Sequence, residues 1–126
     1  MKKQPPPKTY GELMERHGLK PRCYGGIGDG WVQIVDDLIK RLIKAGWDRQ
    51  LGQVKEKHGG LRVYLDGEAS VEFGVLVAKA EARAWKTCEI CGNPGKLRGT
   101  DWVSTKCVNC WKRFRHSISK RTFGEK

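Results

Sequence analysis

The chain has 126 residues, a net charge of +11 and 38% hydrophobic residues, which suits one ordinary domain or a small domain with an attached module. No apolar run approaches the roughly 20 residues that a membrane-spanning helix needs. The basic N-terminus also lacks the apolar stretch of a signal peptide. Composition therefore argues against a membrane protein and predicts a cytoplasmic one.

Basic residues gather at the two ends of the chain. Residues 1–22 carry a net charge of +4, residues 23–85 hold nine basic and nine acidic side chains, and residues 86–126 carry +7. Such asymmetry favours a polyanionic partner, most often nucleic acid. The alternative is a soluble protein with a charged tail.

The N-terminal part predicts an arm, a short helix and a loop. Residues 1–8 are rich in Pro and Lys, which favours a flexible basic arm. Thr9 can cap a helix that ends at His17 before Gly18. The five glycines within residues 18–30 predict a connecting loop, because no strand precedes them as a phosphate-binding glycine motif requires.

An amphipathic helix is predicted over residues 30–45. Its apolar residues recur at helical spacing and form one continuous face, which favours a core helix over a partner-binding one. Asp29 is positioned to cap this helix and Gly46 to end it. The apolar face comprises Trp31, Ile34, Val35, Leu38, Ile39, Leu42 and Ile43.

A β-hairpin is predicted over residues 53–65, with Gly59-Gly60 as its turn, because apolar and polar residues alternate from Leu61 to Leu65. His58 at the tip shows no partner or pocket, so a solvated turn residue is favoured over a catalytic base. Ser70 then caps a helix over 71–86. That helix runs into the first cysteine pair with almost no linker, so the following module should be docked on the body.

Four of the five cysteines form a metal-ligand pattern, C-x2-C-x15-C-x2-C. Two residues between thiols let one tight turn present both sulfurs to one ion, and four thiolates satisfy tetrahedral zinc. The spacing therefore predicts one structural Zn²⁺, ahead of a disulfide pair, an iron–sulfur site or redox pairs. The predicted ligands are Cys88, Cys91, Cys107 and Cys110.

This ligand set argues against catalysis, because four thiols leave zinc no open position for water or substrate. The zinc-deaminase pattern is absent as well. The residues between the two pairs suit a short hairpin, with strands at 96–98 and 102–106, and Gly92 suits a knuckle with an unusual backbone angle. Cys23 is left over, with a buried inert thiol as its expected role.

The second cysteine pair is expected to open a helix. Trp111, Phe114 and Ile118 share one face of it, and basic residues occupy the others. Lys and Arg would meet phosphates, and Trp102 or Trp111 could stack on a base if exposed. The candidate nucleic-acid-binding residues are Lys96, Arg98, Lys106, Lys112, Arg113, Arg115, Lys120 and Arg121.

Residues 88–112 resemble the GATA-type treble-clef zinc fingers. Those fingers share a C-x2-C-G knuckle, a hairpin bearing a tryptophan and a second cysteine pair that opens a helix. The gap here is shorter and the residues after the second pair differ, so base-specific recognition does not carry over. The matching positions are Cys88, Cys91, Gly92, Trp102, Cys107, Asn109 and Cys110.

A second resemblance covers about residues 30–110. The runs 53–57 and 59–62, followed by the knuckle 88–95, are similar to a group of short, mostly uncharacterised bacterial and phage proteins. That similarity implies a phage or prophage setting, and a host cytoplasm as the location, but no established activity.

The expected fold is α+β: a flexible arm (1–8), a helix–hairpin–helix body (9–86), a treble-clef-like four-cysteine zinc finger with a basic helix (87–121) and a tail (122–126). The first functional hypothesis is a non-enzymatic zinc protein that binds nucleic acid, DNA rather than RNA, and no small-molecule substrate. The second is a phage-encoded module that inhibits or redirects a host protein or nucleoprotein complex. An HNH nuclease also uses a treble clef, but the 91–107 hairpin has no histidine to act as its base.

Overall fold

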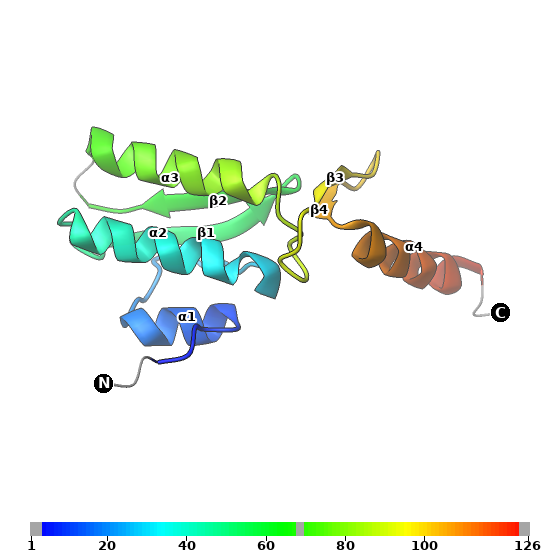
Figure 1. Ribbon diagram of the computed structural model, residues 1–126, viewed down its shortest axis with the longest axis horizontal. Coiled ribbons are helices and arrows are strands. Elements are labelled where there is room, and N and C mark those ends of the chain that lie inside the picture. Colours follow the sequence, from blue (N-terminus) through cyan, green and yellow to red (C-terminus); the bar gives the residue numbers. More distant parts are fainter. Residues whose placement is uncertain (1–3, 68–69, 124–126) are drawn as a thin grey trace.

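The computed structural model describes the backbone of residues 4–67 and 70–123 and the side chains up to residue 117 within those ranges. This part of the chain combines helices with two antiparallel two-stranded sheets (Figure 1), which confirms the predicted mixture of the two. None of its helices has the length and apolar character needed to cross a membrane. The elements are α1 (Tyr10–His17), η1 (Asp29–Trp31), α2 (Val32–Lys44), β1 (Leu51–Lys57), β2 (Gly60–Leu65), α3 (Val71–Ala84), β3 (Lys96–Arg98), β4 (Ser104–Lys106) and α4 (Val108–Phe123).

The hydrophobic core lies between the β1–β2 sheet and two helices. Helices α2 and α3 contact each other and cover one face of the sheet, and α1 packs against α2 (Figure 1). The predicted apolar stripe is buried in this core except for Ile43, which is partly buried at its edge. Val54, Leu61 and Val63 reach the same core from the strands.

The ends of α1 and α2 follow local capping rules except at one point. The Thr9 side chain accepts a hydrogen bond from the backbone N–H of Glu12 (3.1 Å), and Gly18 ends α1 in the left-handed region, both as predicted. Gly46 (φ 95°) likewise follows the end of α2. The predicted cap by Asp29 is wrong, because a turn of 3-10 helix precedes α2 and no side chain caps it.

The first hairpin begins two residues earlier than predicted, at Leu51, and a bulge separates Leu51 from Gln53 in the pairing with β2. Its turn is His58-Gly59, and Gly60 already belongs to β2, so the predicted turn was one residue late. Both turn residues have positive φ (52° and 85°), which is the conformation that suits the twist of a two-residue hairpin loop.

The glycine-rich loop is more than a connector. Its residues 22–26 run along the free edge of β1, where the backbone N–H of Cys23 donates to the Gly52 carbonyl (2.8 Å) and that of Gly26 to the Val54 carbonyl (2.8 Å). An added Cβ at Gly25 would overlap the Val54 carbonyl, so glycine permits this close approach. The loop therefore protects a sheet edge from unwanted pairing.

Candidate metal centre

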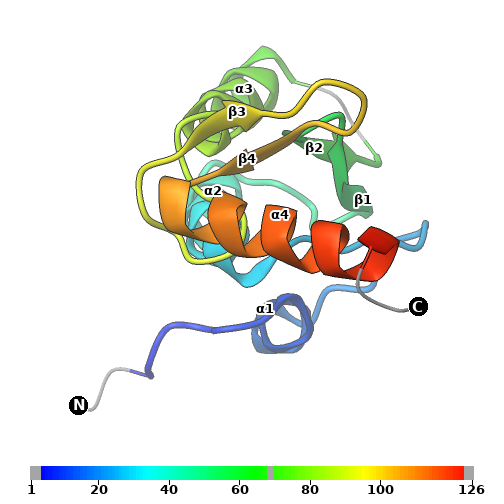
Figure 2. The same ribbon diagram turned by 90° about the vertical axis from the view of Figure 1, so that its right-hand side faces the viewer.

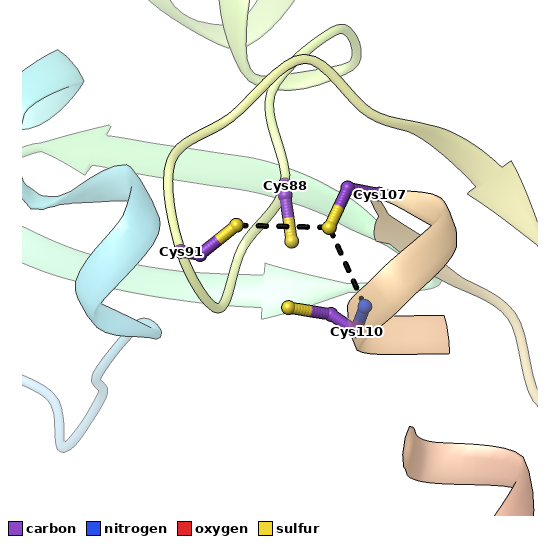
Figure 3. Close-up of side chains that lie close together, drawn as sticks. All are labelled: Cys88, Cys91, Cys107 and Cys110. Atoms are coloured by element: carbon purple, nitrogen blue, oxygen red, sulfur yellow. Dashed lines mark hydrogen bonds between the residues drawn. The ribbon is translucent and has the colours of Figure 1, made fainter. Parts of the chain in front are cut away.

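The four cysteines that the sequence pairs come together at one point beside the body (Figure 3). Their sulfur atoms all lie within 4.8 Å of one another. Sγ of Cys91 lies 3.7 Å from Sγ of Cys107. The cluster thus combines two sequence segments that are separated by a whole hairpin.

The spacing of the sulfurs fits a single tetrahedral ion. Four ligands at the usual Zn–S distance of about 2.3 Å place neighbouring sulfurs roughly 3.8 Å apart. The Cys91–Cys107 separation matches that edge, and no other pair exceeds it by more than about 1 Å. The chain therefore holds a four-thiol cluster that can bind one metal ion.

The electrostatics of the four thiols are uneven. Burial raises the pKa of the Cys88 thiol, but backbone N–H groups of Cys107, Cys91 and Ile90 outweigh it and bring that pKa down to about 7. Burial and the other three sulfurs raise the pKa of Cys110 to about 12. Four thiolates so close together repel one another, and a bound cation removes that repulsion.

Local backbone geometry presents the first pair of sulfurs. After α3 the chain turns back on itself, where the N–H of Cys88 donates to the Asn93 carbonyl (2.7 Å) and that of Gly92 to the Cys88 carbonyl (2.9 Å). Gly92 has the positive φ (83°) that the knuckle was predicted to need. Turn and sulfurs are thus fixed together by main-chain hydrogen bonds.

The second pair sits at the N-terminus of α4. Cys107 precedes the first helical residue, and Cys110 lies in the first turn, with its backbone N–H 3.4 Å from Sγ of Cys107 (Figure 3). The free N–H groups of a helix N-terminus favour negative charge, so this position suits thiolates. Nη2 of Arg113, one turn on, lies 3.6 Å from Sγ of Cys110 and offsets further thiolate charge.

The knuckle is seated in a cradle formed by the glycine loop. The N–H of Gly30 donates to the Glu89 carbonyl (2.8 Å), and the N–H of Gly28 donates to a Glu89 carboxylate oxygen (3.2 Å). Glu89 thereby satisfies backbone N–H groups at the start of η1, the 3-10 turn that leads into α2. A Cβ on either glycine would overlap the main chain of the knuckle.

Two further contacts join the module to the body. Nε1 of the fully buried Trp31 donates to the Thr87 carbonyl (2.8 Å), and Oγ1 of Thr105 on β4 donates to the Gly59 carbonyl at the hairpin tip (2.7 Å). The module is therefore docked on the body, as predicted from the near absence of a linker between the helix over 71–86 and Cys88. The sequence pattern did not identify Gly28, Gly30 or Thr105 as contacts between the module and the body. The high glycine content of residues 18–30 was the only sequence feature that pointed to them.

The basic residues predicted to bind nucleic acid fall into separate groups. Lys96 is exposed on β3, and Lys112 and Arg115 are exposed on α4 together with Arg113. Nε of Arg98 donates to the Lys106 carbonyl (2.8 Å), which ties that side chain to the hairpin. Lys120 and Arg121 lie within α4, but their side chains fall outside the described residues.

Lys106 requires a correction. Its side chain is buried, with Nζ 2.6 Å from Oγ of Ser104 and 4.5 Å from the centre of the Phe114 ring. This cation–π contact fastens α4 to β4 and removes the ammonium from the surface. Lys106 is therefore not available to a phosphate.

The two tryptophans of the module differ in exposure. Trp102, in the turn between β3 and β4, is 72% exposed, whereas Trp111 is half-buried and stacks on Phe114 with ring centroids 5.5 Å apart. Of the two candidates for base stacking, only Trp102 presents most of its ring to solvent.

No family model, curated protein or solved structure matches this chain. The site is therefore assigned from its own residues. They define a chain of mixed helix and sheet that carries a four-cysteine module, able to bind a metal ion, docked on its body.

Proposed function

We propose that the chain is a non-enzymatic zinc protein that binds nucleic acid, preferably DNA, through the basic surface of its four-cysteine module. Four thiolates at tetrahedral spacing are the donor set of structural zinc, and they leave no open coordination position for catalysis. Cysteine turn, hairpin and helix follow in the order of a treble clef. The resemblance to small bacterial and phage proteins adds a phage or prophage origin to the proposal.

The observation that carries the nucleic-acid proposal is the position of α4. The helix starts at the cluster and projects away from the body (Figure 1 and Figure 2). Lys112, Arg113 and Arg115 are exposed on it, and residues 102–123 include no Asp or Glu. A projecting helix that carries positive charge and no nearby acidic residues suits contact with phosphates. A metal bound by Cys107 and Cys110 would anchor the N-terminus of this helix.

Salt dependence tests this proposal. Each phosphate contact contributes about −0.9 to the slope of log K against log salt on duplex DNA, so four to six contacts give a slope of roughly −4 to −5. The double variant Lys112→Glu/Arg115→Glu should weaken binding to all sequences alike, because phosphate contacts carry no base information. Arg113 is left in place because it contacts Cys110. Equal binding by parent and variant, or none by the parent at low salt, would refute the proposal.

A protein partner is the second candidate function. The module exposes the apolar side chains of Ile90, Leu97, Trp102 and Val108, and exposed apolar side chains of this kind favour a protein contact. The candidate partner is a host protein or nucleoprotein complex. A pull-down from host extract with and without nuclease separates the two functions, because a protein captured after nuclease treatment would favour this second one.

A further inference from the structure

The β1–β2 sheet has a second face that the core does not use. Side chains alternate along a strand, so Val54 and Val63 point into the core while their neighbours point away from it. Both views show α2 and α3 on the other side of the sheet (Figure 1 and Figure 2). The outward-pointing residues include Gln53, Lys55, Arg62 and Tyr64.

Two cations lie directly opposite each other on this face. Lys55 pairs with Arg62 in the register of the antiparallel ladder, which places their Cβ atoms about 5 Å apart. Like charges in this arrangement destabilise a hairpin unless an anion offsets them. Among the residues that the structure describes, no carboxylate forms an ion pair with either of them.

Two tyrosines lie in the adjacent row. Tyr64 is 45% exposed and pairs with Gln53 across the ladder. Tyr24 is 97% exposed, in the segment that runs along β1, and its carbonyl accepts a hydrogen bond from Nε2 of Gln53 (2.6 Å). A row in which Gln53 lies between Tyr24 and Tyr64 is thus next to a basic row, Lys55 and Arg62.

We propose that this sheet face, defined by Tyr24, Gln53, Lys55, Arg62 and Tyr64, binds single-stranded nucleic acid. The two cations meet phosphates, and tyrosine rings stack on bases. A duplex keeps its base faces stacked and offers this surface only its phosphates, so the single strand is the ligand that uses both rows. The face is separate from α4, so this inference and the proposed function can fail independently.

The register suggests a variant that separates binding from stability. Lys55→Glu places a carboxylate opposite Arg62, so the hairpin gains an opposite-charge pair while the face loses its excess charge. We expect an unfolding midpoint at or above that of the parent, with weaker binding of single strands. Lys79→Glu is the matched control, because Lys79 is exposed on α3, on the helix side of the sheet, and the change in net charge is the same.

Binding of a labelled oligothymidine of about 12 nucleotides, which is within the range of one binding site, measures the effect. Lys55→Glu should reduce the slope of log K against log salt by roughly 0.7 for each phosphate of the single strand that the variant no longer neutralises. Tyr64→Ala should weaken binding at least about five-fold, the effect expected for one stacked base. The same two substitutions are also made in the α4 variant Lys112→Glu/Arg115→Glu, where their effects on single-strand binding should be unchanged.

Several results would overturn the inference. Equal decreases in affinity for Lys55→Glu and Lys79→Glu would mean that net charge alone matters. An unchanged affinity of the Tyr64→Ala variant for the oligothymidine would show that no base stacks on Tyr64. Competition by polyglutamate that is as strong as competition by unlabelled oligothymidine would assign the face to an acidic protein instead.

Discussion

The body and the cysteine module of this chain are stabilised in different ways. In the described part of the body, seventeen residues between Leu13 and Ala84 form one buried apolar cluster that includes most of the stripe of α2. Burial of this kind contributes about 25 cal/mol for each Å² of apolar surface removed from water. The body therefore has the core of an ordinary small domain.

The module has no comparable core. Among its described side chains, the buried ones are two cysteines and the three residues of β4, Ser104, Thr105 and Lys106. Polar residues in those positions are held by hydrogen bonds and by one cation–π contact rather than by apolar packing. The module therefore depends on a bound metal and on its docking to the body, and each dependence can be tested separately.

The largest expected effect follows from loss of a metal ligand. Cys91→Ser leaves three thiols, and Cys91 is exposed, so the change makes no cavity in the core. Structural zinc contributes an apparent binding free energy of about 10–16 kcal/mol, so a large share of the module's stability should disappear. We expect hydrogen exchange to rise throughout residues 87–117 while the centre of α2 stays protected.

Cys23→Ser is the control, because Cys23 lies outside the cluster and should keep both the metal and the protection. Elemental analysis should find one zinc per chain in the parent protein and in this control. A Cys91→Ser protein whose module stays fully protected would contradict the dependence on metal.

The joint between the two regions gives a smaller effect. In Gly30→Ala the new methyl would overlap the Cys88 carbonyl and the backbone of Gly92, so we expect a loss of about 1–3 kcal/mol, the usual cost of overpacking. Gly74→Ala is the matched control, since nothing lies near an added Cβ on that exposed position of α3. There alanine should stabilise by about 0.5–1 kcal/mol.

Chemical denaturation measures both changes, and metal affinity identifies where the first one acts. Because the overlap is with the knuckle, Gly30→Ala should also weaken metal binding, whereas Gly74→Ala should not. A Gly30→Ala protein with the stability and metal affinity of the parent would mean that the module is not seated on the glycine loop.

The body was the more predictable of the two regions. Periodicity identified α2 and β2, and the capping residue Ser70 located the start of α3. Each element buries one apolar face in a single core, so local pattern and tertiary packing agree. The cysteine spacing likewise identified the cluster, since few arrangements other than one ion satisfy two such pairs. These predictions rest on constraints that act within one segment or one motif.

The contacts between segments were not predictable. Glu89, rather than Asp29, contacts the N–H groups at the start of η1, and a lysine that reads as a surface cation is buried over Phe114. Both contacts depend on the positions of the knuckle and the hairpin in the folded chain. The local sequence pattern carries no information about those positions. Residues 23–85 have no net charge. Folding nevertheless places Lys55 opposite Arg62, and among the described residues no carboxylate pairs with either.

The smallest expected effect is a surface ion pair of the body. Nε of Arg22 donates to Oδ2 of Asp66 (2.7 Å), which ties the loop before α2 to the end of β2. This hydrogen bond lowers the pKa of Asp66 below its ordinary value of 3.8. The folded state thus favours the charged carboxylate, so the pair stabilises the protein above about pH 4 and loses that contribution as the pH falls below the folded-state pKa.

Asp66→Asn should therefore lower the unfolding midpoint of the body slightly at pH 7 and not at all near pH 2, where both proteins carry a neutral side chain. The difference should also shrink at high salt, because the pair is exposed. The measurement follows circular dichroism of the helices, and both proteins are compared without metal at the two pH values, since acid also displaces metal from thiolates. A difference that persists unchanged near pH 2 would show that Asp66 stabilises the loop through its shape and neutral hydrogen bonds rather than through its charge.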